Sequence, residues 1–159
     1  MDPQLSKAIV DFFLGISLFQ KMNAEEIKAV AKHMSVVDLK AGEILFREGD
    51  EGRFMCFIVS GELEVIKQPG ASRKEVLINT LGRGKSIGEM SVIESLPRSA
   101  TAKARVDTRL FILSRPAFEL VLSRHSNIGI KLLKGIATLL SDNLRKTSCR
   151  LAEYMLPIS

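Results

Sequence analysis

The sequence predicts an α+β fold in which an antiparallel β jelly-roll barrel is flanked by helices at both ends of the chain. Apolar residues recur at helical spacing in residues 1–34 and again after 115. Between these segments, short runs alternate apolar and polar residues, and glycine or proline turns separate the runs. Such strands are typical of antiparallel sandwiches and barrels. Because 159 residues suit one domain with a full core, we expect residues 1–159 to form a single domain.

Residues 1–34 are expected to form the N-terminal helices. Asn23 and Glu26 have the spacing of a capping box, in which each side chain accepts a hydrogen bond from the other residue's backbone amide. Ile27 and Val30 then follow on one helical face. This pattern predicts a helix that begins directly after Asn23.

Residues 35–114 are expected to form the barrel. The strand-like runs in this segment are VVDL, EILF, FMCFIVS, ELEVIK, EVLINTL, ATAKARV and RLFIL. Turn sequences such as EGDEG, PG and GRG lie between them. Each run is therefore predicted to be a strand that ends at a tight turn.

Residues 115–156 are expected to form two C-terminal helices. Pro116 suits a first helical turn, and a longer helix is predicted from about Asn127 to about Met155. Steps of three and four in that helix define a heptad seam: Ile130, Leu133, Ala137, Leu140, Leu144, Thr147, Leu151 and Tyr154. A neighbouring stripe of Leu132, Ile136 and Leu139 is available to pack on the barrel. Because two stripes are present, we favour a homodimer through residues 130–154 over a single amphipathic helix lying on its own domain.

The net charge of +5 raises the question of nucleic-acid binding. Most of the excess lies from Arg115 onward, where there are seven Lys or Arg residues and three acids. Solvated helix faces are often charged in this way. The residues after the long helix are too few for a helix-turn-helix, so we expect no DNA binding.

The expected location is the cytoplasm. No apolar run is long enough to span a membrane, and the N-terminus lacks the basic region of a signal peptide. The two cysteines, Cys56 and Cys149, are therefore expected to be free thiols, and no membrane association is expected.

The stretch GEMSVIESLPRSATA, residues 88–102, carries the candidate chemistry. Gly88 precedes a predicted one-turn helix over 89–94, whose N-terminus offers free backbone amides to an anion. Pro97 ends that turn, and Arg98 can donate a planar fork of hydrogen bonds to phosphate oxygens. Glu89 can accept hydrogen bonds from ribose hydroxyls. The stretch fits a nucleotide cradle, although an acid and a base alone could equally form a partly buried ion pair.

This stretch resembles the phosphate-binding cassette of cyclic-nucleotide-binding domains. That family includes the regulatory subunits of cyclic-AMP-dependent protein kinase, cyclic-nucleotide-gated channels and the bacterial catabolite activator protein. The resemblance rests on IGEMSVI and PRSA within residues 87–100, and on KAGEILFREGDEG and FIVSGELEV upstream. It covers roughly residues 15–150. It implies a barrel over 35–114 that carries the cassette at 86–101, with a C-terminal helix that serves as a lid.

The resemblance also implies roles for matching residues. Glu89 would accept from the ribose 2′-hydroxyl, with Gly88 beside it, and Arg98 would pair with the cyclic phosphate. Asn143 falls near the position that contacts the base in the bacterial regulators. The other implied ligand-binding residues are Met90, Ser99, Ala100, Val65 and Ile78.

The cassette departs from the family pattern at two places. Ile87 replaces the usual aromatic residue, and Ser91-Val92 replaces the usual Ala-Leu pair. Both keep the character of the site. Ser99 suits contact with phosphate or with a guanine amino group, so cyclic AMP and cyclic GMP both stay open, and the R-S-A sequence favours cyclic AMP.

The expected function is a regulatory sensor without catalytic residues, cofactor or metal. It would bind a cyclic nucleotide, close its C-terminal helix over the base and signal to an effector protein whose identity is unknown. A cupin-type enzyme is disfavoured because such enzymes bind a metal through histidines on strands, and both histidines here lie in or beside predicted helices. A degenerate domain that serves only for dimerisation or docking remains the alternative.

Overall fold

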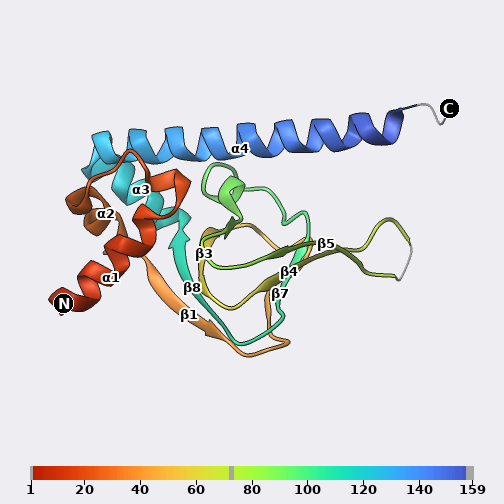
Figure 1. Ribbon diagram of the computed structural model, residues 1–159, viewed down its shortest axis with the longest axis horizontal. Helices are drawn as coiled ribbons and strands as arrows, with labels where there is room; N and C mark the ends of the chain where they lie inside the picture. The colour runs from red at the N-terminus through yellow and green to blue at the C-terminus, as the bar shows by residue number, and fades with distance from the viewer. Residues whose placement is uncertain (1, 72–73, 157–159) are drawn as a thin grey trace.

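The computed structural model describes residues 2–71 and 74–156 (Figure 1). Its helices are α1 (Pro3–Leu14), the 3-10 helix η1 (Ser17–Phe19), α2 (Ala24–Ala31), the 3-10 helix η2 (Glu89–Val92), α3 (Arg115–Arg124) and α4 (Ser126–Met155). Its strands are β1 (Ser35–Leu39), β2 (Ile44–Phe46), β3 (Phe54–Ser60), β4 (Leu63–Lys67), β5 (Val76–Leu81), β6 (Ser86–Ile87), β7 (Thr101–Ala104) and β8 (Thr108–Ser114). The predicted α+β architecture is confirmed, with helices before and after the strands.

The strands form two four-stranded sheets with the orders β1-β8-β3-β6 and β2-β7-β4-β5. The described pairings are antiparallel, and neighbours such as β1 and β8 are distant in the sequence. The chain therefore passes between the two sheets of a β-roll, as the jelly-roll prediction required. Each of the seven predicted runs contains a strand, whereas β6 was missed because two residues carry no periodic pattern.

Strand β3 lies between two hydrophobic clusters. Met55 and Phe57 belong to the cluster that the helices form, whereas Cys56 and Ile58 belong to the cluster inside the barrel. Alternate residues of a strand point to opposite faces, and here both faces are covered. All four side chains are therefore fully buried. The ring of Phe13 in α1 packs edge-on against Phe57, with centroids 5.5 Å apart. The helices thus cover the outer face of the sheet that contains β3.

Helix α2 begins as the capping box predicted. The Asn23 side chain accepts from the Glu26 amide at 2.9 Å, and the Glu26 carboxylate accepts from the Asn23 amide at 3.1 Å. The same carboxylate accepts hydrogen bonds from Lys131 of α4 at 2.8 Å. The Lys131 hydrogen bond lowers the pKa of Glu26. Glu26 therefore caps its own helix and also joins α2 to α4.

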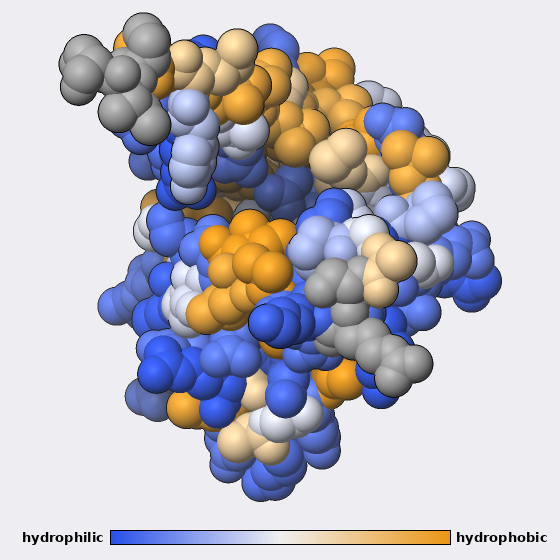
Figure 2. All heavy atoms as spheres, turned by 90° about the vertical axis from the view of Figure 1, so that its right-hand side faces the viewer, coloured by the Kyte–Doolittle hydropathy of each residue, from blue (hydrophilic) through white to orange (hydrophobic). Residues whose placement is uncertain are grey.

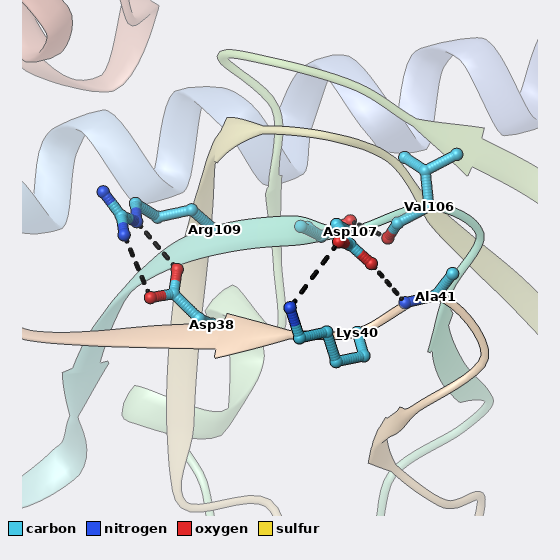
Figure 3. Close-up of polar contacts among 7 residues, drawn as sticks. Asp38, Lys40, Ala41, Val106, Asp107 and Arg109 are labelled. Atoms are coloured by element: carbon cyan, nitrogen blue, oxygen red, sulfur yellow. Dashed lines mark hydrogen bonds and ion pairs between the residues drawn. The ribbon is translucent and has the colours of Figure 1, made fainter.

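Charged side chains connect the end of β1 and the turn after it to the start of β8 (Figure 3). Asp38 of β1 accepts two hydrogen bonds from Arg109, which lies opposite it on β8, at 2.7 and 3.0 Å. Asp107 accepts from the Ala41 amide at 2.9 Å and lies 3.8 Å from the Lys40 ammonium. These pairs are exposed to solvent, so each contributes little to the stability of the fold.

Helix α4 runs from the N-terminal helices across the barrel (Figure 1). Leu132 and Ile136 are buried in the cluster formed by the helices, and Leu139 packs against that cluster. The predicted second stripe therefore packs against the N-terminal helices and the outer face of the sheet that contains β3. The seam residues in the second half of the helix remain exposed, among them Leu144 at 67%, Leu151 at 58% and Tyr154 at 90%. That half of the seam has no partner within the described chain.

No helix in the described ranges is long and apolar enough to cross a membrane. Cys56 and Cys149 are free thiols, the first buried and the second exposed. Burial raises the pKa of Cys56 to about 12, so its thiol stays protonated at neutral pH.

Gly135 allows α4 to lie directly on η1, and its replacement tests this contact. A Cβ at this position would lie 2.5 Å from the carbonyl oxygen of Leu18, a backbone atom that cannot easily move. We expect Gly135→Ala to lower the free energy of unfolding by about 1–3 kcal/mol, despite the better helix propensity of alanine. Urea denaturation at fixed protein concentration measures this. Lys134→Ala, an exposed neighbour, serves as the control, and equal stability of the two variants would contradict the prediction.

Candidate functional site

The cassette begins at Gly88, which joins β6 to η2. Its φ of +81° lies in the left-handed region that favours glycine. A Cβ at Gly88 would lie 2.4 Å from Nη1 of Arg98 and 2.9 Å from the carbonyl oxygen of Phe54. The missing side chain therefore makes room for the arginine that the sequence assigned to phosphate.

Arg98 is 6% exposed and is held on several sides. Its backbone amide donates to the carbonyl of Asp50 at 2.7 Å. Nη1 donates to the hydroxyl of Ser91 at 2.8 Å, and Nη2 donates to the carbonyl of Phe54 at 2.7 Å. The guanidinium also lies over the rings of Phe46 and Phe54, 4.0 and 4.6 Å from their centroids. Stacking and hydrogen bonds together fix its plane.

The charge of Arg98 is not matched by an acid. Within the described ranges, no carboxylate forms an ion pair with it. Its Nε is buried and, in that part of the chain, has no hydrogen-bond partner. Burial lowers the pKa of the guanidinium, and the charges of Asp50 and Glu89 oppose that shift only in part. A buried cation with an unused donor is suited to an anionic ligand.

Glu89 begins η2 and is half-buried. Burial raises the pKa of its carboxyl, while a hydrogen bond from its own backbone amide and the charge of Arg98 act in the opposite direction. Because Arg98 donates to Ser91 and Phe54 instead, the alternative of a Glu89–Arg98 ion pair is not supported in the described chain. The carboxylate is left available for a hydroxyl donor.

A cleft of about 520 Å³ joins the cassette to α4. Its residues come from β2, β4, the segment 87–100 and the second half of α4: Phe46, Val65, Ile87, Gly88, Glu89, Met90, Ser91, Glu94, Leu96, Pro97, Arg98, Ser99, Ala100, Leu140, Asn143, Leu144 and Thr147. Figure 2, which views the side beyond the end of α4, shows the surface hollowed between the overhanging helix and the barrel. A cleft of this volume accommodates a small-molecule ligand.

Eight of the nine residues assigned to the ligand line this cleft. Val65 contributes from β4, and Asn143 contributes from α4, far from the cassette in the sequence. Met90 lies at the rim with 53% of its surface exposed. Ile78 does not line the cleft; it is 49% exposed on β5, the edge strand of its sheet. The structure thus places Ile78 apart from the other eight.

Several residues at the site carried no signal that sequence reasoning used. Phe46 and Phe54 lie in predicted strands, but nothing local indicates that both rings stack on Arg98. Ser91 was noted as a departure from the family pattern, and the structure shows its hydroxyl bonded to Arg98. Thr147 was assigned to the heptad seam and also lines the cleft.

The residues described contain no cluster of three or more His, Cys, Asp or Glu side chains that could hold a metal ion. The polar groups gathered at the cleft are instead one cation, Arg98, with two carboxylates, Glu89 and Glu94, and small polar side chains. Side chains of these types can form hydrogen bonds with phosphate and hydroxyl groups.

Comparisons with known proteins show to which family the chain belongs. A family model described as the cyclic nucleotide-binding domain matches residues 36–125. A solved cyclic nucleotide-binding domain from Methylobacillus flagellatus is 30% identical, with a TM-score of 0.83 over 98% of this chain and 86% of that chain. The CRP-like cAMP-activated global transcriptional regulator of Mycobacterium tuberculosis is 27% identical over 138 residues, 87% of this chain.

The chain spans only part of its curated relatives. It covers 59% of the mycobacterial regulator. It covers 7% of a lysophospholipase from Chaetomium globosum, to which it is 34% identical over 105 residues, 64% of this chain. What is shared is thus the domain that the family model describes. Because that model matches more than half of the residues, this chain belongs to the cyclic nucleotide-binding domain family.

Proposed function

We propose that residues 1–159 act as one regulatory domain that binds a cyclic nucleotide, with cyclic AMP favoured over cyclic GMP, and that has no catalysis of its own. Family membership supports the general function, since domains of this family are typically regulatory. The barrel over 35–114 carries the cassette at 86–101, and helices lie before and after it, within 1–34 and 115–156.

The observation that carries the proposal is the unmatched charge of Arg98 at the wall of the cleft. A singly charged cyclic phosphate supplies the missing counter-charge, and a guanidinium can donate to two of its oxygens. Burying a cation away from water costs free energy, and a nearby anion offsets that cost. The cleft is therefore best suited to a ligand with a negative charge beside Arg98.

The rest of the cleft suits a nucleoside. The half-buried carboxylate of Glu89 is proposed to accept from the ribose 2′-hydroxyl. Val65 and Leu140 offer apolar contact to the sugar and base, and Asn143 and Thr147 offer polar contact to base edges. Two features favour cyclic AMP: the R-S-A sequence at 98–100, and the mycobacterial relative, which is described as cAMP-activated. Neither feature excludes cyclic GMP.

Helix α4 is proposed to act as the lid. Its residues Asn143, Leu144 and Thr147 already face the cleft, so a bound base would be in contact with the helix. A ligand that contacts α4 as well as the cassette favours the closed arrangement by its difference in affinity for the two states. Leu144 would then exclude water from the base.

The same helix is proposed to form a homodimer along residues 130–154. Ile130, Leu151 and Tyr154 are 49%, 58% and 90% exposed, at the spacing of a heptad seam. The dimer, or a separate effector protein, would receive the signal. A domain that docks or dimerises without any ligand is the second candidate, and the exposed seam alone would support it equally well.

Replacing Arg98 tests the ligand assignment. We expect Arg98→Ala to weaken cyclic AMP binding by about 2–4 kcal/mol, or about 30- to 1,000-fold, because the phosphate charge loses its partner. Isothermal calorimetry against cyclic AMP, cyclic GMP and cyclic dinucleotides measures both the loss and the preferred base. Thermal unfolding without ligand shows whether the variant folds.

Arg109→Ala is the matched control, since Arg109 is an exposed arginine on β8 that does not line the cleft. It should bind as the wild type does. Wild-type affinity of Arg98→Ala would contradict the assignment. Absence of any thermal shift of the wild type with these nucleotides would favour the docking candidate.

Glu89 predicts a pH dependence of binding. Burial raises the pKa of the Glu89 carboxyl above its ordinary value. The ionised carboxylate therefore destabilises the fold. This destabilisation is absent at low pH and develops as the pH rises through the raised pKa. A ribose hydroxyl donates to the ionised form. Affinity for cyclic AMP should therefore rise as pH rises through this pKa, and Glu89→Gln should bind weakly with a flatter profile. A pH profile in the variant as steep as that in the wild type would argue against this role.

The seam predicts the oligomeric state. We expect the wild type to sediment as a dimer and Leu151→Glu to sediment as a monomer, because the substitution places a charge in the apolar seam. Leu151 is exposed in the isolated chain, so the fold should survive. Ala152→Glu, exposed on the next position but outside the seam, is the control. A dimeric Leu151→Glu protein would place the interface elsewhere.

A further inference from the structure

Arg115, the first residue of α3, donates hydrogen bonds to the cassette without lining the cleft. Its Nε donates to the carbonyl of Ser91 at 2.9 Å, and its Nη2 donates to the carbonyl of Glu94 at 2.7 Å. Nη2 also donates to the carbonyl of Gly52 at 2.9 Å, and Nη1 donates to the hydroxyl of Ser95. One guanidinium thus binds backbone carbonyls of two segments: the end of η2 with the residues after it, and the loop that precedes β3.

Ser91 takes part in a buried contact with Arg98 and in a part-buried contact with Arg115. Its carbonyl accepts from Arg115, while its hydroxyl accepts from Nη1 of Arg98 at 2.8 Å. Ser91 is 7% exposed, and a Cβ on Gly52 would lie 2.3 Å from its oxygen, so the side chain has little room to turn. A shift of the Ser91 backbone must therefore move the group that orients Arg98.

The backbone around Arg115 joins the same parts. The Arg115 amide donates to the carbonyl of Arg53 at 2.8 Å, and the Gly52 amide donates to the carbonyl of Leu96 at 3.2 Å. The start of α3, the loop before β3 and the cassette are thus bonded to one another. Helix α3 in turn packs on α4, where Gly129 allows close contact with Leu122.

Arg115 does not line the cleft, so it cannot contact a ligand there. Within the described ranges it has no ion-pair partner, and its hydrogen bonds go to oxygens of the two loops. We propose that Arg115 is a positioning residue, which fixes Ser91–Ser95 so that Ser91 orients Arg98 toward the phosphate and which ties that segment to the start of α3. Its effect on binding rests on the proposed function, whereas its hold on the cassette does not.

The first test needs no ligand. Hydrogen exchange followed by NMR should show faster exchange of the Ser91, Ile93 and Glu94 amides in Arg115→Ala, because the carbonyls that Arg115 binds are released. Arg115→Lys, which keeps the charge but not the planar fork, should lie between this variant and the wild type. Arg124→Ala, an exposed arginine at the other end of α3, is the control. Unchanged exchange in Arg115→Ala would overturn the proposal, whatever the wild type binds.

The second test is a double-mutant cycle measured by calorimetry with cyclic AMP. Arg115→Ala should weaken binding about 10- to 100-fold, the range seen for residues that orient a binding group from outside. In the Arg98→Ala background the same change should have little effect, because its target is gone. Equal losses in both backgrounds would mean that Arg115 has only a general structural role. Failure of the wild type to bind any cyclic nucleotide would overturn the proposed function and leave the exchange result to decide the hold on the cassette.

Discussion

The cleft is arranged around the buried guanidinium of Arg98. This cation is enclosed by the protein, yet no carboxylate of the described chain forms an ion pair with it. Two aromatic rings, a hydroxyl and a carbonyl take the place that a carboxylate would fill in an ordinary ion pair. These partners hold the cation in place but do not cancel its charge. The surrounding chain is constrained accordingly: Gly88 must be a glycine for the arginine to fit, and Gly52 must be one for Ser91 to approach.

The barrel supplies the rigidity that this arrangement needs. Strand β3 is buried on both faces, so it belongs at once to the barrel interior and to the layer formed by the helices. Phe54, the first residue of that strand, provides both a ring and a carbonyl to Arg98. Because the strand is packed on both sides, it cannot shift without disturbing two cores. The acceptor for Arg98 is therefore held by much of the molecule.

Two arginines in this region have opposite roles. Arg98 lines the cleft and keeps an unused donor, whereas Arg115 does not line the cleft and donates to several backbone carbonyls. The first is suited to a ligand and the second to holding a segment of chain in one conformation. Ser91 lies between them and contacts both. The family usually has alanine at this position. In this chain the serine hydroxyl accepts a hydrogen bond from Arg98, which an alanine could not do.

The sequence by itself determined the helices and the longer strands, and it marked the cassette as the candidate site. The Asn23–Glu26 capping box, the alternating runs of the barrel and the heptad steps of α4 are local patterns, since they depend on backbone periodicities of a few residues. The motif at 88–100 indicated Glu89 and Arg98 through their side-chain chemistry and through its resemblance to the family's cassette. Only the tertiary structure decided what encloses that arginine. Arg98 and Phe54 are 44 positions apart in the sequence, and no local pattern records that they touch. The same holds for the contacts of Arg115 with Gly52 and for the position of Ile78 outside the cleft, because the path of the chain between the two sheets sets which side chains meet.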